Sequence, residues 1–230
     1  MSNADKKRVY FFEEGNAEGR TELKWLLGGK GANLAEMANV GLPVPPGFTL
    51  TTETCQEFQE LGEGWPEGLE EEVDRNLEKL EQVTDRKLGD LDNPLLVSVR
   101  SGAAQSMPGM MDTILNLGLN DDSVQGLAKE SGDERFAWDC YRRFIQMFGN
   151  VAMKIPHQDF DEHLHKAREE AGVKYDSQLE ADELKKIVKS FKKIYKADTG
   201  EDFPEDPKKQ LRRGIDAVVC SWNNRQAVRY

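Results

Sequence analysis

The chain has 230 residues, of which 38% are hydrophobic and 32% are charged, and its formal net charge is −11. A chain of this length forms one large domain or two smaller ones with a proper hydrophobic core. Its acidic field repels nucleic acid, and no stretch approaches the roughly 20 apolar residues of a membrane span. We therefore expect a soluble protein that binds neither nucleic acid nor a membrane.

The N-terminus and the cysteines indicate an intracellular location. Residues 1–8 lead into polar and strand-like sequence, without the apolar run of a signal peptide. The three cysteines, Cys55, Cys140 and Cys220, are odd in number, far apart and without a Cys-x-x-Cys pair. This usage is typical of a reduced, cytoplasmic protein without a structural zinc site.

The first part of the chain, residues 8–118, alternates short β-rich runs with helical stretches. In chain order we expect a strand at 8–12, a helix from about Gly31 to Asn39, a strand at 46–52, a polar helical stretch and a strand at 94–100. The mixture predicts an α+β fold for this part.

Residues 121–197 form a separate unit that we expect to be helical. Apolar residues recur there near the 3.6-residue helical period, and two further helices are predicted at 162–170 and 182–196. The first of these runs comprises Phe136, Tyr141, Phe144, Ile145, Phe148 and Val151. Residues 200–207 then hold two prolines among acidic residues, which indicates a linker, and a last helix begins near Pro207.

The helix predicted at 182–196 has a strongly basic face. Its apolar stripe comprises Leu184, Ile187, Val188, Phe191 and Ile194, and six lysines occupy the other positions: Lys185, Lys186, Lys189, Lys192, Lys193 and Lys196. Such a face is typical of any solvated surface helix, and docking of an acidic partner domain is the alternative.

The segment Gly28–Gly31, with the sequence Gly-Gly-Lys-Gly, has the features of a phosphate-binding turn. Glycines let the backbone approach an anion, the following helix supplies unpaired N–H groups and a positive dipole end, and Lys30 adds a charge. The spacing is neither that of a Walker A motif nor that of a dinucleotide-binding turn. A double glycine before a helix is also common in tight turns without a ligand.

Arg100 follows the apolar run 95–99 and so lies at the end of a predicted strand. Sheets commonly present ligand contacts at the ends of their strands. A buried arginine requires an anionic partner, which is either a ligand or one of the chain's own carboxylates. The small-residue segment 101–113 after it cannot form a regular element, and we expect it to be a mobile flap.

His163 and His165 lie two apart on a predicted helix and form a poor metal pair, so they are expected at the surface.

Six segments of the chain resemble pyruvate phosphate dikinases. They are residues 26–37, 41–49, 96–102, 107–113, 115–119 and 141–148, and the resemblance runs from about Val9 to Tyr230. The segment Met107–Thr113 distinguishes this family from the related phosphoenolpyruvate synthases. The resemblance implies an α+β fold: an N-terminal ATP-grasp subdomain at 1–118 and 207–230, with an inserted all-helical subdomain at 119–206.

The resemblance also implies a function. The family converts ATP, inorganic phosphate and pyruvate into AMP, pyrophosphate and phosphoenolpyruvate through a phosphorylated histidine on a swivelling domain and a pyruvate-binding barrel. Lys30 and Arg100 would be catalytic, Lys30 on the ATP phosphates and Arg100 on the transferred phosphoryl group. The residues that would bind the nucleotide are Gly28, Gly29, Lys30, Gly31, Arg100, Ser101, Gly109, Met110, Asp112 and Thr113.

The resemblance places the remaining machinery outside this chain. None of the three histidines lies in the sequence context of the family's phosphate carrier. The magnesium ligands that accompany ATP are expected after Tyr230, so we expect no metal ligands here and no complete catalysis by the chain alone. The expected partners are ATP, phosphate and the phosphohistidine and pyruvate-binding domains of a full-length homodimer.

Three functional hypotheses remain open from the sequence. The chain is the ATP-binding portion of a dikinase, a stand-alone nucleotide-binding or regulatory module without catalysis, or a structural fragment that binds no ligand. The first is favoured because the ATP-facing segments are intact.

Overall fold

The computed structural model describes residues 6–101 and 113–221. Contacts divide the chain into two compact units. Unit 1 comprises Met1–Asp85, Ser101–Met111 and Val219–Tyr230, and unit 2 comprises Arg86–Arg100 and Asp112–Val218. Both contain helices and strands, which is compatible with the predicted α+β class. None of the helices in these described ranges is both long and apolar enough to cross a membrane.

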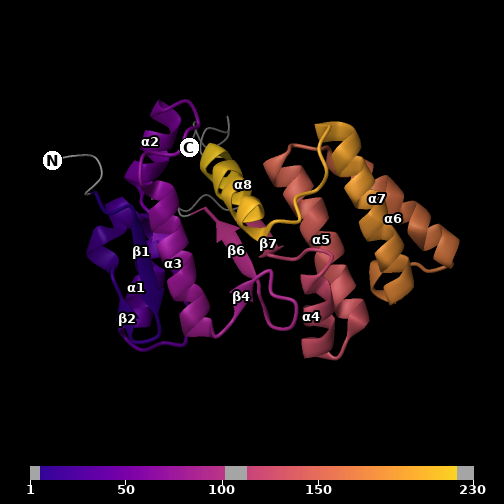
Figure 1. Ribbon diagram of the computed structural model, residues 1–230, viewed down its shortest axis with the longest axis horizontal. Coiled ribbons are helices and arrows are strands. Elements are labelled where there is room, and N and C mark those ends of the chain that lie inside the picture. The colour runs from indigo at the N-terminus through magenta and orange to yellow at the C-terminus, as the bar shows by residue number, and fades with distance from the viewer. Residues whose placement is uncertain (1–5, 102–112, 222–230) are drawn as a thin grey trace. The chain divides into compact units, whose positions relative to one another are not determined.

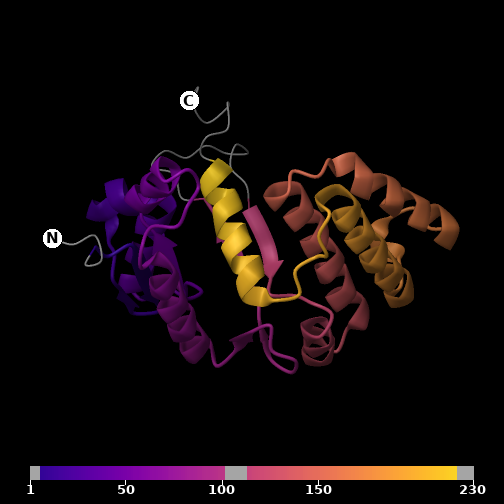
Figure 2. The ribbon, with the colours of Figure 1, turned by 45° about the horizontal axis from the view of Figure 1, so that its top comes forward.

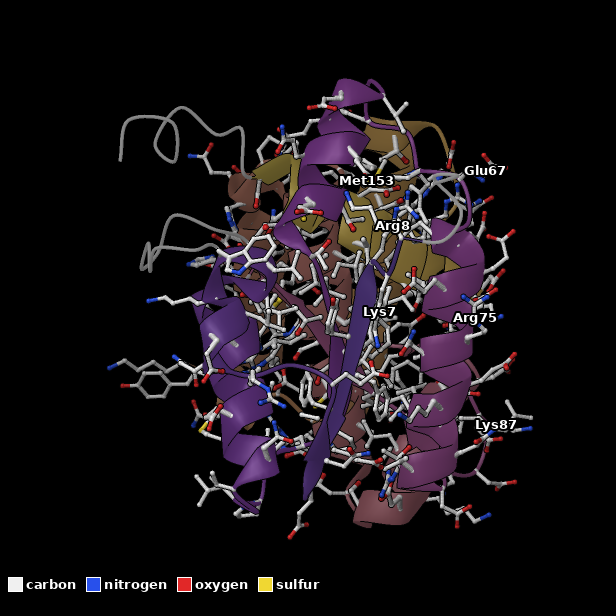
Figure 3. The ribbon with its side chains drawn as sticks, turned by 90° about the vertical axis from the view of Figure 1, so that its left-hand side faces the viewer. Lys7, Arg8, Glu67, Arg75, Lys87 and Met153 are labelled. Carbon is white, nitrogen blue, oxygen red and sulfur yellow. The ribbon has the colours of Figure 1, made fainter. Side chains whose placement is uncertain are left out.

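Unit 1 is built on a three-stranded sheet. Its elements are β1 (Val9–Glu13), β2 (Asn16–Ala17), the 3-10 helix η2 (Thr21–Leu23), α1 (Lys24–Asn39), β3 (Gly47–Leu50), α2 (Thr52–Glu60) and α3 (Leu69–Thr84). The strands are antiparallel in the order β2-β1-β3, with Val9 opposite Leu50 and Tyr10 opposite Thr49. Figure 3 shows β1 between α1 and α3. The strands predicted at 8–12 and 46–52 are therefore confirmed.

The core of unit 1 follows the periodicity of its elements. Helix α3 buries Leu69, Val73, Leu77 and Leu80, which repeat at spacings of three and four, while the rest of the helix is largely acidic. Helix α2 begins after Thr51, whose hydroxyl accepts a hydrogen bond from the N–H of Thr54 at 3.1 Å.

The start of β1 is held by an ion-pair network around the buried side chain of Arg8. The Arg8 side chain is 1% exposed, and its Nε donates to Glu57 Oε2 at 3.0 Å. Lys6 Nζ donates to the other Glu57 oxygen at 2.6 Å, and Glu72 accepts from the backbone N–H groups of Arg8 and Val9. Partial burial raises the pKa of Glu57, but the hydrogen bonds from Lys6 and Arg8 outweigh this effect and leave the pKa below its usual value. Figure 3 labels Arg8 at the end of β1 nearer α2.

Unit 2 combines short strands with five helices in its described part. The strands are β4 (Lys87–Leu88), β5 (Pro94–Leu95), β6 (Val97–Arg100) and β7 (Thr113–Leu117), and the helices are α4 (Ser123–Ser131), α5 (Glu134–Ala152), α6 (His157–Ala171), α7 (Ala181–Thr199) and α8 (Pro207–Cys220), with the 3-10 helix η3 (Asp176–Gln178). The pair β4-β5 is parallel and the pair β6-β7 is antiparallel. Figures 1 and 2 show α8 alongside β6 and β7, where a Cβ at Gly214 would approach Ile114, Leu117 and Val99.

An aromatic cluster fills the helical part of unit 2. The ring of Phe203 lies 5.3 to 6.5 Å from the rings of Tyr141, Phe144, Phe148 and Tyr195. Phe203 belongs to the segment 200–207, which was predicted as a linker. Residues 200–206 are indeed without helix, and α8 begins at Pro207, but Phe203 is 4% exposed, so this connection is part of the core.

Phe136 was predicted on the buried apolar face of α5, and this prediction is wrong. Phe136 is 47% exposed, whereas Tyr141, Phe144, Ile145 and Phe148 are fully buried. Tyr141 is five positions after Phe136, and in a helix of 3.6 residues per turn this offset places the two side chains about 140° apart around the helix axis. Ala137, four residues before Tyr141, is buried in its place.

The basic face of α7 is partly neutralised by carboxylates from elsewhere in unit 2. Lys192 contacts Asp121 and Glu205 at 2.6 Å each. Lys185 and Lys196 likewise have carboxylate partners at 2.8 Å. Lys186, Lys189 and Lys193 are exposed. His163 and His165 are exposed on α6, as predicted.

Candidate nucleotide-binding site

Helix α1 is broken at Gly28, which divides it into two helical segments. Gly28 has φ 70° and ψ 168°, a region that is essentially restricted to glycine. The helix was expected to begin at about Gly31. Instead a first segment starts at Lys24, because Leu26 and Leu27 are buried and hold a turn of helix before the glycines.

The break places Gly29, Lys30 and Gly31 in the first turn of the second helical segment. The N–H groups in the first turn of a helix have no partner four residues earlier, and the helix dipole makes this end positive. Leu26 and Leu27 before the break and Ala32 after it belong to one buried cluster, against which Tyr10 and Leu23 pack. The turn is therefore anchored on both sides.

Gly31 lies directly against strand β3. A Cβ built at Gly31 would lie 2.6 Å from Thr49 Cγ2, closer than real Cβ atoms approach other groups, and 3.0 Å from Thr49 Oγ1, which is a tight contact. The absence of a side chain at Gly31 is thus required by its packing against Thr49. The sequence analysis missed Thr49, because a threonine in a β-rich run gives no signal of its own.

Lys30 is an exposed residue whose ammonium reaches the segment after β6. Its Nζ donates a hydrogen bond of 2.8 Å to the carbonyl oxygen of Ser101, and this contact lies within unit 1. Ser101 is 7% exposed. An ammonium carries three N–H donors, so phosphate oxygens are able to join or replace protein acceptors around it.

Arg100 and Thr113 are paired neighbours in unit 2. They lie opposite each other in the antiparallel pair β6-β7, at the end of β6 and the start of β7. Arg100 is exposed, and in the described part of the chain no hydrogen bond or ion pair holds its side chain. The intramolecular salt bridge that was the alternative to a ligand is not formed among these residues.

The remaining predicted site residues, Gly109, Met110 and Asp112, lie outside the described residues. The structure thus brings Gly28–Gly31 and Ser101 together in unit 1 and pairs Arg100 with Thr113 in unit 2. Within the described ranges, no group of three His, Cys, Asp or Glu side chains is placed to hold a metal ion.

A family model described as "Pyruvate phosphate dikinase, AMP/ATP-binding domain" matches residues 24–87 and 61–230. The chain belongs to this family. The matched residues include every predicted site residue and all the α-helices described above. The resemblance noted from the sequence segments is therefore confirmed.

Curated relatives agree with this assignment. The chain is 55% identical over 224 residues to a chloroplastic pyruvate, phosphate dikinase of Mesembryanthemum crystallinum. The aligned region covers 97% of this chain and 24% of that protein. The chain is 54% identical over 225 residues to the chloroplastic pyruvate, phosphate dikinase 1 of Oryza sativa subsp. japonica and to that of Zea mays, over 98% of this chain and 24% of each relative. The chain thus spans about a quarter of the length of these relatives.

Proposed function

We propose that this chain is the ATP-binding portion of a pyruvate phosphate dikinase, in which it supplies the phosphate-binding side of the nucleotide site. The observation that carries the proposal is the break at Gly28, which opens a new helical segment with Lys30 in its first turn. A helix N-terminus beside a lysine is suited to bind a polyphosphate. In this proposal the N–H groups of the turn Gly28–Gly31 and the Lys30 ammonium bind the ATP phosphates.

Arg100 is proposed to stabilise the phosphoryl group during its transfer. Its side chain is exposed at a strand end, and in the described residues no group holds it, which supports a role in binding an anion. A guanidinium that binds developing charge on a transferred phosphoryl group typically contributes several orders of magnitude in rate. Ser101 and Thr113 flank this position, and Gly109, Met110 and Asp112 are proposed to complete the phosphate contacts.

The proposed architecture is an ATP-grasp subdomain at 1–118 and 207–230 that carries a helical insertion at 119–206. The two ends of the proposed insertion support it, because they lie side by side. Asn120 Nδ2 donates to the Glu205 carbonyl at 2.9 Å, and the N–H of Asp121 donates to the Glu205 carboxylate at 3.0 Å. Among the described residues, the stretch between these contacts contains helices and no strand.

The full-length protein is proposed to phosphorylate a carrier histidine from ATP and phosphate, and then to convert pyruvate to phosphoenolpyruvate. The carrier and the pyruvate site would lie in the remaining domains of a homodimer. Magnesium would accompany ATP and offset its charge, with ligands supplied by the part of the protein beyond Tyr230. We retain a cytoplasmic location as a proposal; several curated relatives are named chloroplastic.

The test is the ATP half-reaction of the longer protein that contains this chain. We expect Lys30→Ala and Arg100→Ala to slow it by at least 100-fold while the pyruvate half-reaction keeps its rate. Matched controls are Lys24→Ala, an exposed lysine on α1, and Lys87→Ala, an exposed lysine in unit 2. An equal loss in both half-reactions would refute these roles.

The alternative function is a nucleotide-binding or regulatory module without catalysis. Its support is the same break at Gly28, which needs no second domain to form the helix N-terminus. Tight Mg-ATP binding by the chain, combined with Lys30→Ala and Arg100→Ala variants that leave the half-reaction unchanged, would favour this alternative.

A further inference from the structure

Gly31 of α1 packs directly against Thr49 of β3 in unit 1. Thr49 lies opposite Tyr10 in the β1-β3 ladder, so its backbone is held by strand pairing. Its two side-chain branches both face Gly31: a Cβ at Gly31 would lie 2.6 Å from Cγ2, 3.0 Å from Oγ1 and 3.3 Å from the Thr49 Cβ. Helix α1 therefore rests on a branched, rigid side chain.

We infer that Thr49 is a positioning residue for nucleotide binding, and that the Gly31–Thr49 contact sets the place of the phosphate-binding turn. The inference rests on the proposed function and extends it to a residue on β3. Gly31 precedes the buried Ala32 and follows Lys30, so a displacement at Gly31 moves the N–H groups of the turn and the Lys30 backbone together.

The size of the displacement follows from the contact. A methyl group at Gly31 must retreat by about 0.8 Å from Thr49 Cγ2 to reach the 3.4 Å of ordinary van der Waals contact. A lost or badly aligned hydrogen bond to a charged group weakens binding by about 10- to 100-fold. We therefore expect Gly31→Ala to weaken Mg-ATP binding by about 10- to 100-fold.

Removal of the Thr49 branches should reverse this loss. In the double variant Gly31→Ala, Thr49→Ala, the nearest atom of residue 49 to the new methyl group is Cβ, at 3.3 Å. We expect its affinity to return to within about threefold of the wild type, because the new methyl group fills the space of the Thr49 branches. Thr49→Ala alone should weaken binding by more than about threefold, because it leaves Gly31 without the side chain that supports it. Asn33→Ala, at an exposed position on the same helical segment, is the matched control.

Calorimetry with Mg-ATP on the four variants and the wild type tests the inference, with urea unfolding to show that each variant is folded. Restored affinity in the double variant supports the inference. A double variant as weak as Gly31→Ala would overturn it, because the loss would then come from the methyl group meeting the ligand.

A second readout separates this inference from the proposed function. Lysines labelled with ¹³C-methyl groups report the surroundings of Lys30 by NMR without any nucleotide, with the Lys30 signal assigned from Lys30→Arg. The signal should move in Gly31→Ala and return in the double variant. If it does so while no variant binds ATP, the positioning contact stands and the nucleotide function of the chain fails. An unmoved signal would refute the positioning role.

Discussion

Gln210 joins the connection between β7 and α4 to the connection between α7 and α8. Its side chain is fully buried on α8. The amide oxygen accepts from the N–H of Gly118 at 3.1 Å, and the amide nitrogen donates to the carbonyls of Leu119 and Pro204 at 2.9 and 2.8 Å. Replacement by alanine deprives all three backbone groups of their partner.

The expected loss in Gln210→Ala follows from these three bonds. A buried N–H without an acceptor costs about 1–3 kcal/mol, and each lost carbonyl bond costs about 1 kcal/mol more. We therefore expect the free energy of unfolding to fall by about 3–5 kcal/mol. Lys209→Ala, at the neighbouring exposed position, should change it by less than about 0.5 kcal/mol.

Urea unfolding followed by circular dichroism measures both variants under the same conditions. Native-state hydrogen exchange should locate the loss of protection at Gly118 and in the segments that Gln210 joins. A Gln210→Ala variant within about 1 kcal/mol of Lys209→Ala would refute the reasoning, because the three backbone groups would then not depend on this side chain.

Two further predictions concern unit 1. Gly28→Ala forces a side chain into a backbone region used by glycine, so it should lower the free energy of unfolding, measured in urea, by about 2–3 kcal/mol. The control Gly41→Ala, in an exposed turn, should lower it by about 1 kcal/mol. Equal losses in the two variants would contradict the strain at the break. Glu57 has a lowered pKa in the folded state, so its contribution is present at neutral pH and is lost as the pH falls below about 4.5. Glu57→Gln should therefore destabilise by about 1–3 kcal/mol at pH 7, where it weakens the partner of buried Arg8, and the difference from the wild type should shrink towards pH 3. Glu67→Gln, at an exposed position, should show no such change, and a constant Glu57→Gln difference across this range would contradict the assignment.

Elements with strong periodicity could be predicted from the sequence. The helices predicted at 162–170 and 182–196 lie within α6 and α7, because their apolar residues repeat at helical spacing over several turns. The strands at 8–12 and 46–52 could be predicted for a different reason. Their β-rich runs are bounded by glycine, proline or charged residues.

Features set by contacts between distant residues could not be predicted. The break in α1 depends on Leu26 and Leu27 being buried, which extends the helix back beyond the glycines. The position of Phe203 depends on an aromatic cluster drawn from α5 and α7, so local composition gave only a linker.

In the candidate site, too, some residues could be predicted from the local sequence and others could not. Lys30 and the glycines were predicted because their residue types suit a phosphate, and their role stays a prediction. Thr49 is hidden in sequence, since only the folded sheet brings it against Gly31.

Calorimetry of this chain with Mg-ATP, beside Lys30→Ala and Lys24→Ala, tests the central claim most directly. If the turn after Gly28 binds phosphate, the wild type and Lys24→Ala bind ATP alike, and Lys30→Ala binds at least tenfold more weakly. Equal affinity in all three proteins, or no binding by any of them, would contradict the claim that this chain carries a preformed phosphate site.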